Sequence, residues 1–366
     1  MIIGVLRETH PGEQRVALVP SVCLQLTNKG HSIHIEQGAG LAAGFADAAY
    51  EQAGAVVTTK QSVLAAVNVL AHVAVPSPEE IAEYPPGMSV ISYVYPRRNP
   101  HVVQALANAR VNGYALDAVP RITRAQSMDV LSSQNNLAGY KAVIVGANAL
   151  GRVFPLMMTA AGTVTPAKVL IYGAGVAGLQ AIATAKRLGA RVEVSDIRPE
   201  TKEQVESLGA KFITVDGLHD VTVEGGYVAA VRPEVLERQK AAVERVLAEA
   251  DLVITTALVA GGTAPVLISV DQVALMKRGS VIVDMATDAG GNCALSVADA
   301  TVEHNGVTII GSSNLASTVP THASELYAKN MAAFIAATAS ETTISTDVAD
   351  EIVSATLVTL NGEVRL

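Results

Sequence analysis

The chain has 366 residues, of which 50% are apolar and 16% are charged, and this composition excludes an intrinsically disordered protein. The formal net charge of −8 argues against a nucleic-acid-binding protein, because such proteins meet phosphates with a basic surface. Two cysteines, Cys23 and Cys293, are too few for a disulfide framework or a four-cysteine zinc site, and they fit a reducing compartment. The sequence shows neither a signal peptide nor an apolar run of about 18 residues, so we expect a cytoplasmic protein without a membrane span.

Short apolar segments alternate with amphipathic ones along most of the chain, as is typical of parallel strands joined by helices. We expect a first series of strands at residues 2–6, 32–36, 56–58, 69–75, 89–94 and 113–116. We expect a second series at residues 168–172, 191–195, 211–214, 252–255, 280–284 and 307–310. The sequence therefore predicts an α/β protein with two Rossmann-like, doubly wound parallel-sheet domains.

Two longer segments predict helices that bridge these domains. Residues 127–159 are rich in alanine and leucine and predict one long helix, with a break at Gly139 or Gly146 as the alternative. A second helix is expected over 323–337, after the last strand. The domains would then be 1–130 plus 320–366, a discontinuous first domain, and 131–319, a second domain that includes the bridging helix.

The segment KVLIYGAGVAGLQAIATAKRLGARVEVSD carries the strongest local motif. Gly173, Gly175 and Gly178 stand in G-x-G-x-x-G register after an apolar strand and at the start of a helix. Such glycines permit a tight turn, the close approach of a pyrophosphate, and close packing of helix on strand. The helix that begins near Val176 would point free N–H groups at the phosphates. This segment predicts a dinucleotide-binding site.

Asp196 ends the next strand, where a carboxylate accepts hydrogen bonds from the adenosine ribose. This charge favours NAD(H), because the 2′-phosphate of NADP(H) would lie against a second negative charge. Arg198 would offset that preference if it faced the ribose, and it is as readily explained as a solvated surface residue.

The segment VPRITRAQSMDVLSSQNNLAGY, residues 119–140, is unusually polar for so apolar a chain. Gln126, Asp129 and Ser132 are three residues apart, so on one helix they would share a face. Ser127 or Asp129 as a helix cap explains one or two of these polar residues. We expect the others to line a cleft between the two domains.

This polar segment is similar to the signature of the NAD(H)-binding component of proton-translocating NAD(P) transhydrogenases. The resemblance covers essentially the whole chain and includes the segments RETHPGEQRVALVP, TKEQVESLGAKFITVD, VITTALVAGG and DAGGNC. Asp288, in the last of these regions, stands where the family more often has glutamate.

The resemblance implies roles for particular residues. A loop of Arg121, Gln126, Asp129 and Ser132 would hold the dihydronicotinamide ring, with Gln126 reaching the NADP(H) of a partner component. Asp129 is expected to pair with Arg121 or to hold the carboxamide. A mobile Gly225-Gly226-Tyr227 loop would close over the nucleotide. The remaining cofactor-binding residues that it implies are Gly173, Gly175, Val176, Gly178, Asp196, Ile197, Arg198, Ala257 and Leu258.

The chemistry of these residues agrees with that assignment. Oxidation of an alcohol or an amino acid moves a proton together with the hydride and needs an acid–base group. Transfer between two nicotinamide rings needs only that they be held face to face without water. The polar segment contains no histidine or lysine, so it suits the positioning of a ring.

The alternative is an enzyme resembling alanine dehydrogenase, which shares the fold and the opening segment. Those enzymes handle the amino acid with a lysine and a histidine, and the matching positions here are His72 and Tyr93. A nucleotide sensor without catalysis is a third hypothesis. A sensor would need contacts to the adenosine and the phosphates but not the nicotinamide loop, so the presence of Arg121, Gln126, Asp129 and Ser132 argues against it.

The resemblance also implies an assembly. The chain would act only with an NADP(H)-binding component and a membrane proton-channel component, as a homodimer attached to the inner face of the membrane through these partners. We expect no contact with nucleic acid, and no residue spacing predicts a metal site.

Overall fold

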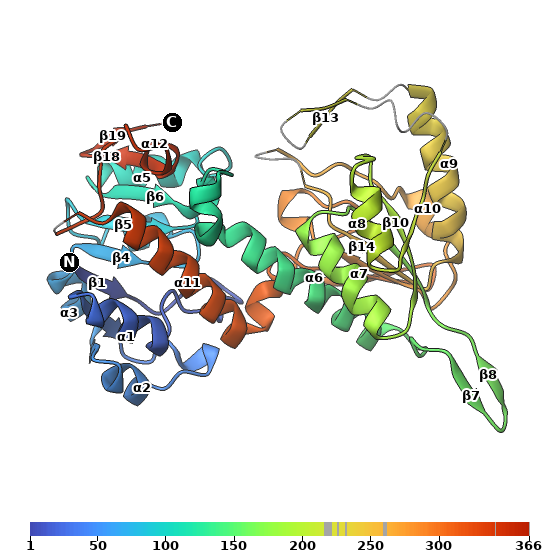
Figure 1. The fold of residues 1–366 in the computed structure, drawn as a ribbon, viewed down its shortest axis with the longest axis horizontal. Helices are drawn as coiled ribbons and strands as arrows, with labels where there is room; N and C mark the ends of the chain where they lie inside the picture. Colours follow the sequence, from blue (N-terminus) through green and yellow to red (C-terminus); the bar gives the residue numbers. More distant parts are fainter. Residues whose placement is uncertain (216–221, 225–226, 231–232, 259–261, 341, 366) are drawn as a thin grey trace. The chain divides into compact units, whose positions relative to one another are not determined.

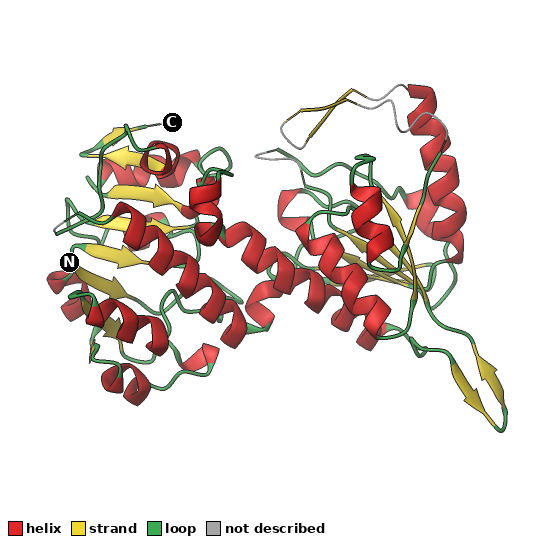
Figure 2. Cartoon of the chain, viewed as in Figure 1, coloured by secondary structure: helices red, strands yellow, loops and turns green. Residues whose placement is uncertain are grey.

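A computed structural model of the chain describes residues 1–366 except 216–221, 225–226, 231–232, 259–261, 341 and 366. The chain divides into two compact units: unit 1 is Met1–Gln134 with Ala316–Leu366, and unit 2 is Asn135–Leu315. Each unit has a mostly parallel sheet with helices against it (Figures 1 and 2). The predicted α/β class with two doubly wound sheets is confirmed.

Among the described residues, the sheet of unit 1 has the order β19-β18-β6-β5-β4-β1-β2-β3. Its strands are β1 (Ile2–Val5), β2 (Ser32–Glu36), β3 (Val56–Thr58), β4 (Val69–Ala71), β5 (Ser89–Ser92), β6 (Asn112–Ala115), β18 (Leu357–Leu360) and β19 (Glu363–Val364). The strands β1 to β6 are parallel, whereas β18 pairs antiparallel with β6. The chain reverses its direction of travel across the sheet between β1 and β4, which makes this pair the topological switch point of unit 1.

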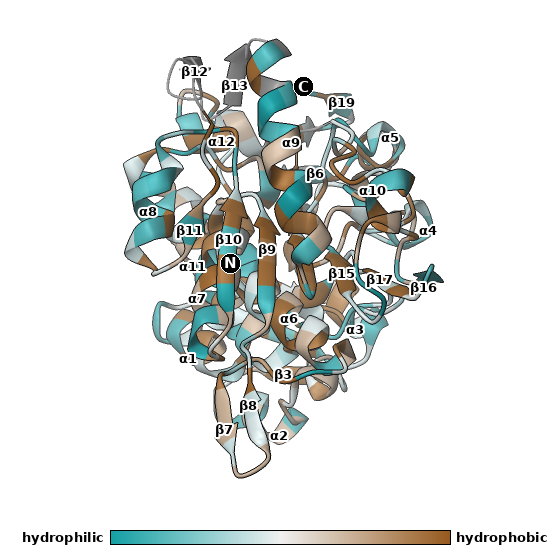
Figure 3. Cartoon of the chain, turned by 90° about the vertical axis from the view of Figure 1, so that its right-hand side faces the viewer, coloured by the Kyte–Doolittle hydropathy of each residue, from teal (hydrophilic) through white to brown (hydrophobic). Residues whose placement is uncertain are grey.

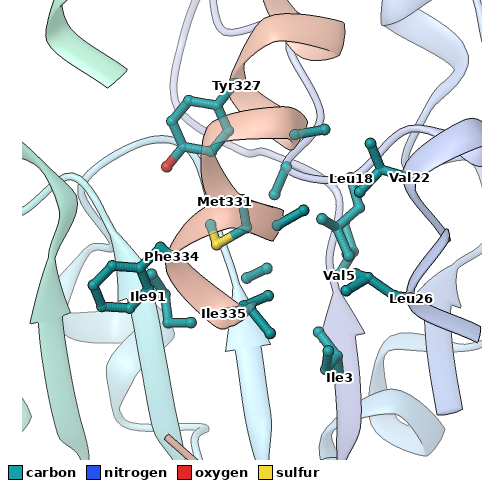
Figure 4. Close-up of a cluster of buried hydrophobic side chains, with 14 of the residues drawn as sticks. Ile3, Val5, Leu18, Val22, Leu26, Ile91, Tyr327, Met331, Phe334 and Ile335 are labelled. Carbon is teal, nitrogen blue, oxygen red and sulfur yellow. The ribbon is translucent and has the colours of Figure 1, made fainter. Parts of the chain in front are cut away.

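Helices pack on the sheet of unit 1 and supply most of its core. They are α1 (Pro20–Asn28), α2 (Asp47–Gln52), α3 (Lys60–Ala66), α4 (Pro78–Ile81), α5 (Pro100–Asn108), α11 (Pro320–Thr338) and α12 (Glu351–Thr356), with the short 3-10 helices η1 (Leu41–Ala43), η2 (Leu116–Ala118) and η3 (Thr123–Met128). In Figure 4, Met331, Phe334 and Ile335 of α11 lie in one cluster with Ile3 and Ile91 of the sheet. Each such buried side chain contributes about 1.5–3 kcal/mol, so α11 belongs to the core of unit 1.

Among the described residues of unit 2, the sheet has the order β11-β10-β9-β14-β15-β17-β16, and only β16 is antiparallel to its neighbour. Its strands are β9 (Lys168–Tyr172), β10 (Arg191–Ser195), β11 (Lys211–Phe212), β14 (Leu252–Thr255), β15 (Val281–Asp284), β16 (Thr301–His304) and β17 (Val307–Gly311). Its helices are α7 (Val176–Arg187), α8 (Thr201–Ser207), α9 (Pro233–Glu249), α10 (Val270–Ala274) and the 3-10 helix η5 (Thr287–Ala289). Apolar residues predominate along β9 (Figure 3), as expected for a central parallel strand covered on both faces.

Two hairpins lie outside this sheet. They are β7 (Met157–Thr159) with β8 (Gly162–Val164), and β12 (Thr222–Glu224) with β13 (Tyr227–Ala230). The 3-10 helix η6 (Leu315–Thr318) contributes residues to both units.

The predicted helix over 127–159 is wrong at both ends. The helix α6 spans Val130–Ala149, and the unit boundary falls within it. Asp129 caps its start by accepting a hydrogen bond of 2.8 Å from the Ser132 N–H. The helix ends before Pro155, and the chain then forms the β7–β8 hairpin, in which β8 begins at Gly162 with φ of +130°.

The alternative of a break at Gly139 or Gly146 is also wrong, because α6 runs through both residues. A Cβ on Gly139 would lie 2.1 Å from the Ala177 carbonyl oxygen, and one on Gly146 would lie 2.5 Å from the Leu252 side chain. Both glycines therefore let neighbouring elements of unit 2 approach α6 closely.

Candidate functional site

The glycine-rich turn joins β9 to α7 in unit 2. Gly173 has φ of +98°, and a Cβ on it would lie 2.5 Å from Thr256 Oγ1. A Cβ on Gly178 would lie 1.9 Å from the Gly173 carbonyl oxygen, so this glycine is needed for the packing of helix on turn. Gly175 differs, since a Cβ there would meet no protein atom within 4 Å. The missing side chain of Gly175 leaves open space above the turn.

The first turn of α7 faces this space without a side-chain cap. Gly175 occupies the N-cap position and provides no capping group, and the first turn carries no acidic residue. Backbone N–H groups at such a helix start bind anions, and the helix dipole adds to the attraction. Val176, the first helical residue, is 40% exposed. The turn has the geometry that a pyrophosphate requires.

Asp196 follows β10 and is tied to both the turn and Arg198. Its Oδ2 accepts from the Ala174 N–H at 2.7 Å and from Arg198 Nη2 at 2.8 Å. Its Oδ1 accepts from the Arg198 N–H at 2.8 Å and from Arg198 Nε at 3.0 Å. The interpretation of Arg198 as a solvated surface residue is wrong. Between these two residues, Ile197 is 45% exposed.

The segment after β14 contains Ala257 and Leu258. Asn292 holds it, because Asn292 Oδ1 accepts from the Ala257 N–H at 3.0 Å and Nδ2 donates to the Ala257 carbonyl at 2.9 Å. Asp284, at the end of β15, accepts from the Asn292 N–H at 2.8 Å and from the Cys293 N–H at 2.9 Å. Sequence reasoning missed Asp284 and Asn292; the motif DMATDAGGNC contains both, but only the fold shows which segment they support.

Cys293 is buried, and burial raises the pKa of its thiol. Asp288, which stands where the family more often has glutamate, is exposed in η5.

Of the loop predicted to close over the nucleotide, Gly225 and Gly226 lie outside the described residues. Tyr227 begins β13 and pairs in register with Glu224.

The polar segment of unit 1 does not form one helix face. Gln126 lies in the 3-10 helix η3, Asp129 caps α6 and Ser132 lies inside α6. Asp129 Oδ2 also accepts a 2.6 Å hydrogen bond from Ser132 Oγ. The expected pair of Asp129 with Arg121 does not form among the described residues. Arg121 and Gln126 are exposed, and Asp129 and Ser132 are half-buried.

Neighbouring polar residues hold this segment in place. Asn330 of α11 donates to the Ser127 carbonyl at 2.7 Å and accepts from Ser133 Oγ at 2.7 Å. Arg124 forms a two-point ion pair with Asp350, at 2.9 and 3.0 Å. Sequence reasoning missed Asn330 and Asp350, which are about 200 residues away along the chain. The exposed Arg121 and Gln126 thus stand on a backbone that is fixed by its neighbours.

The residues that distinguish the alternative enzyme are buried in unit 1. His72 Nδ1 lies 3.1 Å from the Ala74 carbonyl oxygen and 3.2 Å from Glu8 Oε2, so this nitrogen carries a proton. Tyr93 is buried, and burial raises the pKa of its hydroxyl.

Arg15 is also buried there, and each of its three side-chain nitrogens donates a hydrogen bond to a neighbouring side chain. Its Nε and Nη2 donate to the Glu13 carboxylate at 2.8 and 2.6 Å, and its Nη1 donates to Gln134 Oε1 at 2.9 Å.

Comparison with known proteins places this geometry in a family. Residues 4–138 match the model "Alanine dehydrogenase/PNT, N-terminal domain", and residues 142–366 match "Alanine dehydrogenase/PNT, C-terminal domain". The chain is 46% identical over 374 aligned residues to an NAD(P) transhydrogenase alpha subunit of Rhodospirillum rubrum, covering 100% of this chain and 97% of that protein. It is 31% identical to alanine dehydrogenase of Bacillus subtilis, over 80% of this chain and 72% of that enzyme.

A solved transhydrogenase structure from Sinorhizobium meliloti superposes with a TM-score of 0.92 at 44% identity, over 100% of both chains. These matches cover the glycine-rich turn as well as the polar segment. The chain therefore belongs to the alanine dehydrogenase/PNT family, as a relative of NAD(P) transhydrogenase alpha subunits.

Proposed function

We propose that the chain is the NAD(H)-binding subunit of a proton-translocating transhydrogenase. It passes a hydride directly from NADH to NADP⁺ held by a partner subunit. The observation that carries this proposal is the polar segment, residues 119–140. Its backbone is held in place by neighbouring side chains, while Arg121 and Gln126 are exposed. The segment contains no histidine or lysine that could serve as a general acid or base. The names of its relatives support the same role.

The glycine-rich turn supplies the nucleotide-binding part of this function. The open space at Gly175 and the uncapped start of α7 at Val176 fit a pyrophosphate. Asp196, Ile197 and Arg198 bind the adenosine half, and Ala257 and Leu258 line the path of the nucleotide. Bound NADH supplies the hydride. Asp196 supplies the carboxylate for the ribose, and it engages the guanidinium of Arg198 by hydrogen bonds of 2.8 and 3.0 Å. Because Arg198 is already paired in this way, we assign NAD(H) rather than NADP(H) to this subunit.

The polar segment supplies the orientation of the ring. Arg121, in the loop before η3, and Gln126, within η3, offer hydrogen-bond donors from exposed side chains, and Gln126 extends toward the partner's nucleotide. Asp129 and Ser132 lock each other by two hydrogen bonds of 2.6 and 2.8 Å, which fixes the start of α6 and with it the loop. Gly226 and Tyr227 are included in the proposed nucleotide-binding residues on the resemblance alone.

Transfer between two nicotinamides moves no proton to or from substrate, so this segment needs no general acid or base. The groups that would handle an amino acid in unit 1 support the same conclusion. His72 stands where alanine dehydrogenases have a lysine and Tyr93 where they have a histidine, and the raised pKa of the buried Tyr93 keeps its hydroxyl from acting as a base at neutral pH. Alanine dehydrogenation is the weaker candidate for this reason.

The proposal includes an assembly. The chain acts with an NADP(H)-binding component and a membrane proton-channel component, as a homodimer attached to the inner face of the membrane through those partners. No helix among the described residues is long and apolar enough to cross a bilayer.

The substitution Gln126→Ala tests the role of the polar segment. We expect hydride transfer to NADP⁺ on the NADP(H)-binding component to fall at least tenfold, while NADH affinity stays within about twofold, because Gln126 positions the ring but does not hold the nucleotide. The matched control is Ser127→Ala, an exposed neighbour in the same turn. Equal loss in both variants, or unchanged transfer in Gln126→Ala, would refute the assignment.

A further inference from the structure

A cavity of about 120 Å³ lies in unit 1 at the carboxyl end of β1. Arg7 and Thr9 line it from the segment that follows β1, and Glu36 is the last residue of β2. The other walls come from the start of α3 and from α4 with the turn after it. Because β1 and β4 form the topological switch point of this sheet, the cavity lies where open α/β sheets bind ligands. It belongs to neither of the sites described above.

Three donor groups of this cavity have hydrogen-bonding capacity to spare. The guanidinium of Arg7 is exposed and forms no ion pair in the described part of the chain. Lys60 Nζ donates to Glu83 at 2.7 Å, which leaves it two further N–H donors. Tyr84 is only 4% exposed, and its hydroxyl has no hydrogen-bond partner among the described residues. A buried hydroxyl left unpaired costs folding free energy, so a group that pairs with it in the cavity would be bound favourably.

The two acids of the cavity behave differently. Glu80 is occupied, because Oε1 accepts from Thr9 Oγ1 at 2.6 Å and Oε2 accepts from the Ser77 N–H at 2.8 Å. Burial acts to raise the pKa of Glu80, but these hydrogen bonds, together with His72 and Lys60 nearby, outweigh it and the net pKa is lowered, so the group stays ionised. Glu36 uses Oε2 to accept from the Arg7 N–H at 2.8 Å. Its Oε1 is therefore the acceptor that the cavity offers to a ligand.

We propose that this cavity binds a small carboxylate that also carries a hydroxyl or ammonium group. The ligand carboxylate meets Arg7, Lys60 and Tyr84, while its donor meets Glu36. A planar carboxylate matches the fork of a guanidinium. A doubly charged phosphate is disfavoured, because Glu36 and Glu80 place two negative charges in the same walls. The volume is several times the ~30 Å³ that one water molecule takes, so a small organic acid fits.

Glycolate is the probe for this site, and acetate is its matched partner without the hydroxyl. We expect glycolate to bind the full-length protein measurably by calorimetry and to raise its thermal unfolding midpoint, and we expect acetate to bind about tenfold more weakly. Tyr84→Phe removes only the unpaired hydroxyl. This variant should unfold at the same or a higher temperature without ligand, and its glycolate affinity should fall about tenfold.

Arg7→Gln is expected to weaken glycolate binding by a similar factor, and Arg97→Gln, an exposed arginine outside the cavity, is the control that keeps wild-type binding. The proposal is overturned if wild-type protein binds no glycolate or binds acetate equally well. It is also overturned if Tyr84→Phe binds like wild type, or if Arg97→Gln loses as much affinity as Arg7→Gln. NADH affinity is expected to stay unchanged in Tyr84→Phe, so this site and the nucleotide site are tested separately.

Discussion

Two alanine substitutions in the glycine-rich turn should have opposite effects. Gly178→Ala places a Cβ 1.9 Å from the Gly173 carbonyl oxygen, a backbone atom that cannot swing away. Gly175→Ala places its Cβ in open space, and Gly175 has φ of −77° and ψ of −170°, which any residue adopts. One glycine is therefore required by the fold, and the other by the proposed ligand.

The magnitudes follow from these contacts. A methyl group 1.9 Å from an oxygen must move by more than 1 Å, so Gly178→Ala should cost about 3 kcal/mol or more, at the upper end of overpacking effects. Gly175→Ala loses about 0.5–1 kcal/mol as a poorer N-cap and gains about 0.4–1 kcal/mol from the stiffer unfolded chain. Its net effect on stability is close to zero. Its methyl group nevertheless occupies the space that a pyrophosphate would use.

Urea unfolding followed by circular dichroism, together with NADH titration, measures both effects. We expect Gly175→Ala to unfold like wild type and to bind NADH at least tenfold more weakly, and Gly178→Ala to unfold at distinctly lower urea. Wild-type NADH affinity in Gly175→Ala would refute the placement of the pyrophosphate over this glycine.

Three further substitutions test contacts within single units. Gly139→Ala should destabilise unit 2 by about 1–3 kcal/mol in urea unfolding, because its Cβ would lie 2.1 Å from the Ala177 carbonyl oxygen. Unchanged stability would contradict the close packing of α6 on α7. Asp251→Ala should lower the free energy of unfolding by about 2–4 kcal/mol, since the buried carboxylate pairs with Arg152 at 2.9 Å and accepts a hydrogen bond from the Lys168 N–H at 2.8 Å. The control Asp271→Ala, at an exposed aspartate, should change the free energy of unfolding little. Hydrogen bonds from Arg124 lower the pKa of Asp350 from 3.8 to about 2, so its stabilising effect is complete above pH 3.8 and is lost as the pH falls through 2. The difference in melting temperature between wild type and Asp350→Asn should therefore shrink over that range, and a constant difference would exclude a charge effect.

Much of the fold could be predicted because its signals are local. Apolar strands that alternate with helices, and the strand–turn–helix pattern around Gly173, Gly175 and Gly178, depend on neighbouring residues only. The helix α6 shows where such reasoning fails. Glycines in a helical sequence suggest breaks, but in the structure Gly139 lies against Ala177 and Gly146 lies against Leu252. Only the tertiary fold shows these contacts.

The candidate site was predictable to a similar extent. The polar composition of residues 119–140 located this segment, but the three-residue spacing suggested one helix face where the structure has a 3-10 turn, a cap and a helix. Asp129 illustrates the reason. It lies at the start of α6, where its carboxylate accepts a hydrogen bond from the backbone N–H of Ser132, so the helix begins after it. The supporting residues Asn330 and Asn292 could not be found, since nothing in the sequence indicates which loop a distant side chain holds.

The most direct test of the central claim is hydride transfer from NADH to NADP⁺ with this purified chain and a recombinant NADP(H)-binding transhydrogenase component. We predict rapid NADPH formation in the mixture and none with either protein alone. We also predict no NADH oxidation when the chain alone receives pyruvate and ammonia. Oxidation of NADH in that last reaction, without transfer in the mixture, would contradict the proposed role and indicate alanine dehydrogenase chemistry.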